Sequence, residues 1–321
     1  MTERPPDPAR AARYLLALLF DPSEREAFAA DREGAMAAYG LSASQAASFK
    51  GVSLPGLQAD AQGRERYLMS AMCRVYPLST GAIGSTATGP EALVAFLASP
   101  SLLAGAAARN LAFGAHLERL LSLDALGLGP GVSAFLAPFL AWERALVDNA
   151  TRVRQATARG EHPPTPMPAA EAGLDHPLRL PPALIAASLP CSPELLRGAL
   201  HGLRPEDAWV RIRGRDLSPS RVRAVARAAA AGTALPVLVL ARALITRQSG
   251  EVFATGPGPR DPAPDDPGPL VEVSHRTVEL WGEQIADATE VLRDADGRPM
   301  GALPPRLQGV ARALLQAGLL D

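Results

Sequence analysis

The first half of the chain carries apolar residues at helical spacing, in runs that end at proline, glycine or Asp-Pro steps. The first run, residues 11–20, is apolar apart from Arg13 and stops at Asp21-Pro22. Similar runs predict helices over 64–76, 92–98, 102–123 and 133–157. We therefore expect residues 11–157 to form an all-helical bundle.

Capping signals separate the short helices expected near the start. Ser23, with Glu26 three residues later, fits a capping box that opens a helix. Gly40 fits the left-handed residue that commonly follows a helix. Ser42 or Ser44 fits the N-cap of a third, shorter helix.

The pattern becomes mixed in the second half. Alternation over Ala208–Arg213 predicts a half-exposed strand, and the Val/Leu run Leu235–Ile245 predicts a buried one. Val271–Leu280 is also rich in β-formers, and Asp296-Gly297 is a turn signal. Helices are expected over Pro193–Leu200, Arg221–Ala231, Glu283–Asp294 and Pro305–Leu315. The predicted fold class is therefore mainly α, α+β overall, and the tail has the element order of a winged-helix-like unit.

Proline content suggests the domain boundaries. Seven prolines fall within 159–182, and six within 251–270. The first stretch fits a linker and the second a loop or hairpin excursion. We expect a helical bundle over 1–157 that binds a partner, a linker over 158–182, and an α+β winged-helix-like domain over 183–321.

Composition narrows the class of protein. The chain has 321 residues, 47% of them hydrophobic, and a formal net charge of −1. Such a balance is typical of globular proteins and gives no general attraction to nucleic acid. We find neither a signal-peptide core nor an apolar run of the roughly 20 residues that a membrane span needs. A cytoplasmic protein without membrane contact is expected.

Catalytic and metal-binding motifs were not found. The five histidines do not lie at metal-ligand spacing, and no nucleophile elbow or paired carboxylates occur. Cys73 and Cys191 are far apart, and we expect buried thiols, although a disulfide stays open. The sequence predicts no catalytic residue, no metal ligand and no cofactor in this chain.

Arginines gather in one part of the second half. Arg211, Arg213 and Arg215 would share one face of the expected strand. Together with Arg221 and Arg223 they could contact phosphates, as in a winged-helix DNA-binding regulator. A solvated strand face is the other interpretation, because Lys50 is the only lysine and arginine is common throughout.

Short motifs in two parts of the chain resemble a known family. In the helical half they are Arg66-Tyr67, Met72–Leu78, Leu97, Leu117-Glu118 and Leu140–Ala145, and in the tail Val310–Leu320. The first set resembles the helical domain of partner proteins of multinuclear non-heme iron-dependent oxidative enzymes. Those enzymes modify ribosomally made peptides, often at cysteine. The tail is similar to the end of small winged-helix peptide-recognition domains, from which the proline-rich stretch 254–269 departs.

The resemblance implies a non-catalytic subunit of a heterodimer. The partner enzyme would hold the iron, and this chain would bind the leader of a precursor peptide. The implied peptide-binding residues are Val271, Val273, His275, Arg276, Val278, Arg306, Val310 and Leu314. The implied partner-binding residues are Tyr76, Trp142 and Glu143. The alternatives are the DNA-binding regulator and a stand-alone small-molecule oxygenase that binds iron itself.

Overall fold

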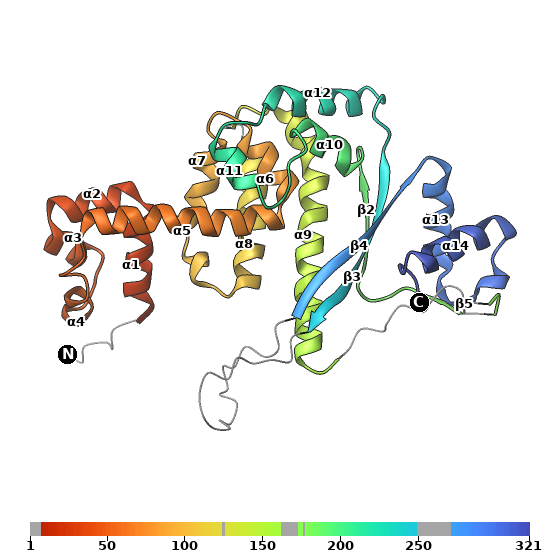
Figure 1. Ribbon diagram of the computed structural model, residues 1–321, viewed down its shortest axis with the longest axis horizontal. Helices are drawn as coiled ribbons and strands as arrows, with labels where there is room; N and C mark the ends of the chain where they lie inside the picture. Colours follow the sequence, from red (N-terminus) through yellow and green to blue (C-terminus); the bar gives the residue numbers. More distant parts are fainter. Residues whose placement is uncertain (1–7, 124–125, 162–172, 176, 249–270) are drawn as a thin grey trace. The chain divides into compact units, whose positions relative to one another are not determined.

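The protein is mainly helical and contains a small antiparallel sheet (Figure 1). The computed structural model describes residues 8–123, 126–161, 173–175, 177–248 and 271–321. The predicted fold class, mainly α and α+β overall, is confirmed. The predicted loop 251–270 and much of the predicted linker lie outside the described residues.

The chain divides into two compact units. The first comprises Met1–Leu140 and Glu194–Ala226, and the second Ala141–Pro193 and Arg227–Asp321. These boundaries differ from the predicted ones. The short helix at 208–213 packs on helices near residues 54–84, far from it in sequence, and composition gives no sign of such contacts.

The first unit is entirely helical. Its elements are α1 (Pro8–Phe20), α2 (Pro22–Ala30), α3 (Arg32–Ala38), α4 (Ala43–Ala47), α5 (Leu54–Val75), α6 (Pro77–Gly84), α7 (Gly89–Val94), α8 (Ala106–Ser122), the start of α9 (Pro130–Ala158), α10 (Pro193–Ala199), α11 (Ala208–Arg213) and most of α12 (Pro219–Ala230). Across the described residues, no helix combines the length and the apolar character needed to cross a membrane.

Two of the three predicted caps are confirmed. Gly40 has a φ of +78° after α3, and Ser42 forms a reciprocal capping box with Gln45 at the start of α4. The prediction for Ser23 is wrong, because the Asp21 side chain accepts from the Ser23 backbone N–H and caps α2. Pro22 at the first helical position needs no backbone hydrogen bond, which fits this earlier start.

The predicted strand Ala208–Arg213 is a helix, α11. Trp209 and Ile212, three residues apart, share its buried face. An alternation of six residues fits either period, and burial against α6 selects the helix. The helices approach closely because Gly84 has no side chain. A Cβ added there would lie 2.7 Å from two carbon atoms of Ile212.

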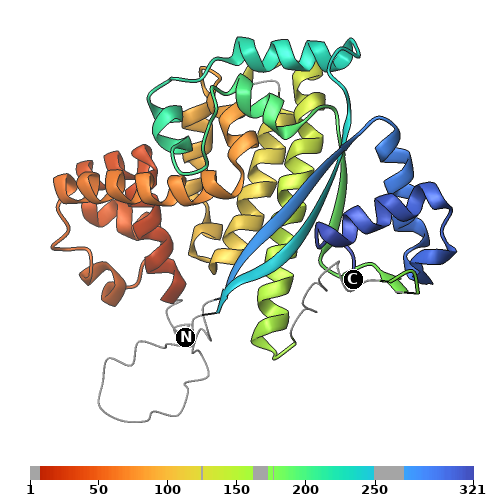
Figure 2. The same ribbon diagram turned by 45° about the vertical axis from the view of Figure 1, so that its right-hand side comes forward.

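The second unit is built on an antiparallel sheet in the order β2-β3-β4 (Figure 2). Its strands are β2 (Leu184–Leu189), β3 (Val237–Gln248) and β4 (Val271–Trp281). The predictions for β3 and β4 are confirmed, whereas β2 was missed because its Ala and Ser residues give a weak β signal. Two further short strands pair with each other, β1 (Pro177–Arg179) and β5 (Asp296–Pro299).

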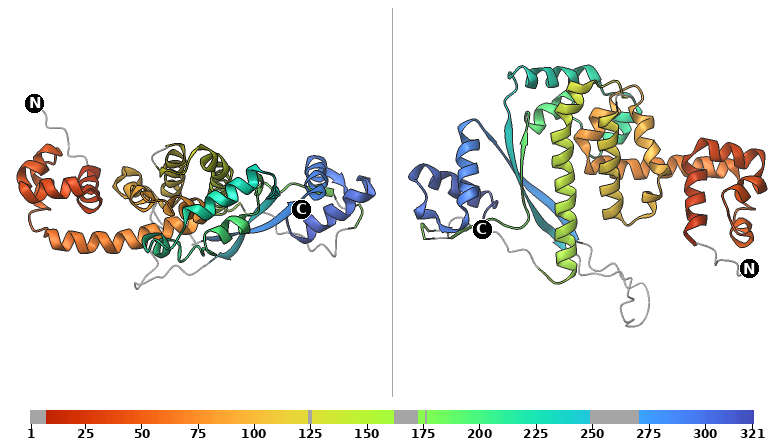
Figure 3. Two further views of the ribbon diagram at one scale, coloured as in Figure 1. Left: turned by 90° about the horizontal axis from the view of Figure 1, so that it is seen from above. Right: turned by 180° about the vertical axis from the view of Figure 1, so that it is seen from behind.

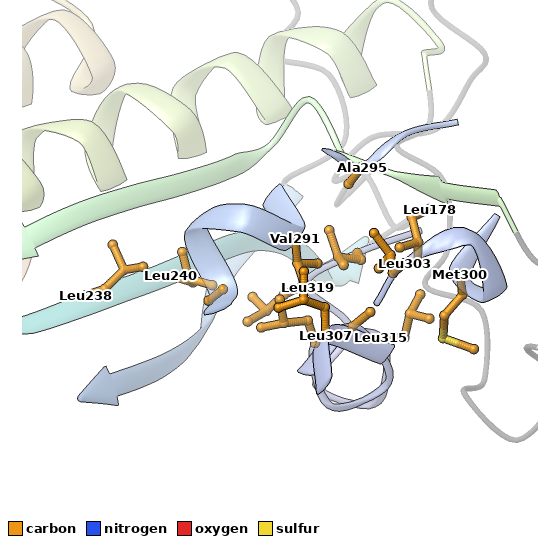
Figure 4. Packing of buried hydrophobic residues seen from close by; sticks show 14 residues of the cluster. Leu178, Leu238, Leu240, Val291, Ala295, Met300, Leu303, Leu307, Leu315 and Leu319 are labelled. Atoms are coloured by element: carbon orange, nitrogen blue, oxygen red, sulfur yellow. The ribbon is translucent and has the colours of Figure 1, made fainter. Parts of the chain in front are cut away.

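Helices cover both faces of the sheet. On one face, the later part of α9 lies beside the sheet (Figure 3). Its Val153 packs there with Ala183, Ala243 and Val273. On the other face, Leu238 and Leu240 of β3 join a core with α13 (Glu283–Asp294) and α14 (Pro305–Gln316) (Figure 4). The side chains of odd- and even-numbered residues of β3 therefore lie on opposite faces of the sheet.

Candidate functional site

Strand β4 lies at the edge of the sheet. It pairs along its length with β3, and within the described part of the chain no strand pairs with its other side. An unpaired edge presents a row of backbone donors and acceptors that can bind another extended chain.

The hydrogen bonds of the sheet identify which groups of β4 are available. The backbone N–H of Ala243 donates to Ala183 O at 3.3 Å. The backbone N–H and C=O groups of the odd-numbered residues of β3 are therefore directed toward β2. The even residues of β3 then bond β4, and their partners include Arg276 and Val278. Consequently the odd residues of β4 direct N–H and C=O groups toward the open edge, at His275, Thr277 and Glu279.

The end of this open ladder is also defined. Trp281 is the next odd residue whose N–H points outward, and it donates to Gln284 Oε1 at 3.4 Å. The Gln284 side chain thus occupies the position that an incoming strand would need. The available groups therefore lie before Trp281.

The opposite edge of the sheet is a poorer docking site. Strand β2 has six residues, and Pro182 and Pro190 flank it. A proline cannot donate to a ladder, so the flanking residues limit any pairing there. Strand β4 has 11 residues. The long edge is therefore the better candidate.

The side chains of β4 differ between the two faces. On the face of α13 and α14, Val278 and Leu280 are half-buried against the apolar core, and Arg276 is exposed. On the other face, Thr277 is exposed and Glu279 is half-buried. The edge thus combines apolar surface with one positive and one negative side chain.

His275 occupies a desolvated position on this strand. Its Nε2 atom is buried and has no hydrogen-bond partner among the described residues. Burial lowers the pKa of His275 below the usual value for histidine, and the positive charge of Arg154 lowers it further. The imidazole is therefore a neutral packing group at neutral pH, while its backbone faces the open edge.

Three of the predicted peptide-binding side chains are half-buried or exposed. Val273 is half-buried on the α9 face, and Val310 is half-buried on α14. Arg306 is exposed on α14 and pairs with Glu290 of α13 at 2.7 Å. This ion pair joins α14 to α13. The side chain of Val271 lies outside the described residues.

Three other predicted residues are core residues. Leu314 is 1% exposed within the C-terminal core, and Tyr76 is 0% exposed, with its hydroxyl donating to Asn110 O at 3.0 Å. Glu143 is 2% exposed. None of these side chains lies on a surface that a ligand can contact. Trp142 is half-buried, and its Nε1 has no partner among the described residues.

The arginines proposed as a phosphate-binding face bind the protein itself. Arg211 donates to His201 O at 2.9 Å, and Arg213 pairs with Glu65 at 3.2 Å. Arg215 donates to two carbonyls after α6 and pairs with a carboxylate of α7. The three residues also do not share a strand face, because α11 is helical. These contacts argue against the DNA-binding alternative.

The cysteines and acidic residues form no reactive group in the described chain. Cys73 and Cys191 are buried thiols and form no disulfide with each other. Burial and the charge of Glu279 raise the pKa of Cys191 to about 11, so its thiol is unreactive. Across the described ranges, no three His, Cys, Asp or Glu side chains lie close enough to hold a metal ion.

Sequence reasoning missed Thr277 and Glu279, whose backbone groups face the open edge. The sequence shows that they alternate with Arg276 and Val278, as His275 does. The direction of their backbone hydrogen bonds, however, depends on the strand order. The charged residues of β4 were the available signal, since charges are common on edge strands.

Comparisons with known proteins add no relative. No family model, no curated protein and no solved structure matches this chain.

Proposed function

We propose that this chain is a non-catalytic, cytoplasmic subunit that binds an extended peptide along β4. In this proposal the peptide is the leader of a ribosomally made precursor. A partner enzyme holds the iron and carries out the oxidative modification. The chain presents the substrate and supplies no cofactor.

The open edge of β4 is the observation that supports peptide binding. Strand addition derives affinity from backbone hydrogen bonds and specificity from alternate side chains. Outward N–H and C=O groups at His275, Thr277 and Glu279 provide the first, and half-buried Val278 and Leu280 provide part of the second. The identity of the partner enzyme rests on the sequence resemblance alone.

Co-expression tests the partnership. The tagged chain is produced with the proteins encoded beside it, purified, and analysed for iron and for each co-purifying protein. The proposal predicts a metal-free chain when it is produced alone and an iron-containing partner when it is co-expressed. Stoichiometric iron in the chain produced alone would contradict the proposal and favour the stand-alone oxygenase.

A proline substitution tests the peptide site. Thr277→Pro removes one outward N–H while leaving the bonds to β3 intact, and edge strands tolerate proline at such a position. We expect roughly tenfold weaker binding of the precursor peptide, since one backbone hydrogen bond and its neighbouring geometry are lost. Thr277→Val keeps the N–H and is the matched control, with circular dichroism to verify folding. Equal affinities of the two variants would refute docking at this edge.

A further inference from the structure

The charges along β4 indicate which peptide sequence the edge accepts, an inference that rests on the proposed function. An added strand would be antiparallel, like the other pairs of this sheet, because antiparallel pairing is the more stable. Residues opposite Thr277 and Glu279 would exchange backbone hydrogen bonds with β4. Residues opposite Arg276, Val278 and Leu280 would place their side chains on the face of α13 and α14.

Apolar partners are expected on that face. Val278 and Leu280 are only half-buried and lie at the margin of the C-terminal core. Apolar side chains directly across from them would cover the remaining surface, as cross-strand pairs do. Arg276, two residues before Val278 on the same face, is exposed, and one of its terminal nitrogens donates to Ala317 O at 3.1 Å. The other N–H groups of the guanidinium favour an acidic residue opposite it.

The other face adds a basic position. Glu279 lies between Val278 and Leu280 in sequence and points to the opposite face. Its carboxylate favours Lys or Arg across the strand. Thr277 is exposed and accepts a range of side chains. The Gln284 contact at Trp281 N–H closes the ladder beyond Leu280 and thereby limits the register.

From this arrangement we infer that β4 selects an extended segment of the pattern apolar–basic–apolar–any–acidic. Read from N to C, its residues lie opposite Leu280, Glu279, Val278, Thr277 and Arg276. Both charged positions and both apolar positions are needed to match the side chains of β4. The ligand is thus a peptide with charges of opposite sign three residues apart.

Selection from a library of short random peptides tests this pattern without a known substrate. The immobilised full chain is the target, and Thr277→Pro is the counter-target that removes edge-independent binders. We expect the selected peptides to be enriched in the pattern. When the Glu279→Lys variant is the target, the selected peptides should carry an acidic residue in place of the basic one. When the Arg276→Gln variant is the target, the preference for the acidic residue should disappear.

Single peptides then give the magnitudes. In Val-Lys-Val-Thr-Asp within a Gly/Ser frame, reversing either charge should weaken binding to the natural chain roughly three- to tenfold. Changing that lysine to glutamate should restore binding to Glu279→Lys. N-methylation of the residue opposite Thr277 should weaken binding at least about tenfold, and of the residue opposite Val278 much less.

The outcomes separate the two proposals. Selected peptides that depend on the Thr277 N–H but lack the charge pattern, or that ignore the Glu279→Lys exchange, would overturn the inferred pattern and leave strand addition intact. A selection in which no peptide distinguishes the natural chain from Thr277→Pro would overturn docking at β4 and the pattern together.

Discussion

Arg242 and Arg276 lie directly opposite each other on β3 and β4, and both donate to the residues that directly follow α14. Arg242 reaches Gly318 O at 3.1 Å and Asp321 Oδ1 at 2.7 Å, and Arg276 reaches Ala317 O at 3.1 Å. Like charges across a strand pair repel each other, but the two backbone carbonyls after α14 and the Asp321 carboxylate offset that repulsion. The pair joins the edge strand to α14.

The two arginines should differ in their contribution to stability. Arg242 is 1% exposed, so Arg242→Met leaves Asp321 and a buried carbonyl without their partner. We expect a loss of about 3 kcal/mol in the free energy of unfolding, as for a broken buried ion pair. Arg276 is exposed, and Arg276→Met should cost about 1 kcal/mol. Urea unfolding measures both, and equal losses would contradict the assigned roles.

Two Gly→Ala changes should have opposite effects on stability, because one glycine lies at the close contact of α6 and α11 and the other faces open space. At Gly84 the new methyl group would overlap Ile212, and overpacking of this kind costs about 1–3 kcal/mol. Gly309 lies within α14 with no atom within 4 Å of an added Cβ. There the change should stabilise the chain by about 0.5–1 kcal/mol. Thermal unfolding compares the variants, and a stabilising Gly84→Ala would disprove the close packing.

The lowered pKa of buried His116 should make the protein less stable in acid. Its Nε2 is 2.9 Å from Ala92 O, its Nδ1 is 2.9 Å from Arg119, and burial lowers its pKa below 6.5. The unfolded chain therefore takes up a proton first as pH falls. Stability contributed by neutral His116 is present above about pH 6.5 and is lost as the pH falls through the folded-state pKa.

Unfolding at about pH 7.5 and about pH 5.5 measures this effect. The natural chain should lose more stability between these pH values than His116→Gln, which cannot titrate. His275, whose pKa is also lowered, acts in the same direction, so His275→Gln should reduce the pH dependence further. An unchanged pH dependence in both variants would show that neither histidine is responsible.

Replacing Tyr14 by phenylalanine should not lower the stability of the protein. Its ring packs against Phe28 and Phe49 in the N-terminal core, but its buried hydroxyl has no partner among the described residues. Tyr14→Phe removes an unsatisfied polar group and should leave stability equal or raise it by up to about 1 kcal/mol. Tyr14→Ala should cost about 3–5 kcal/mol. A large loss for Tyr14→Phe would reveal a hydrogen bond at this position.

Local patterns predicted the elements with strong signals. Glu283–Asp294 was predicted with the bounds of α13, and the Val/Leu run found β3. Six residues misled at α11, because Val210 and Ile212 alternate with arginines as they would in a strand. The buried pair is instead Trp209 and Ile212, whose spacing of three residues puts them on one face only in a helix. Short segments carry too little periodicity to decide between the two.

The site depended on information that local patterns lack. The sequence indicated that β4 is a strand, but its edge position follows from the strand order, which long-range pairing sets. Leu314 and Tyr76 show the same limit, since their residue types suit either an apolar surface or a core. Burial in the folded chain decides between these roles.

Amide hydrogen exchange along β4 tests strand addition most directly. In the free chain, the amides of His275, Thr277 and Glu279 should exchange fast, and those of Arg276 and Val278 slowly, because only the latter bond β3. A bound precursor peptide, or one obtained by selection, should slow exchange at the three odd residues. Exchange that stays fast at those residues while the peptide is bound would contradict the account.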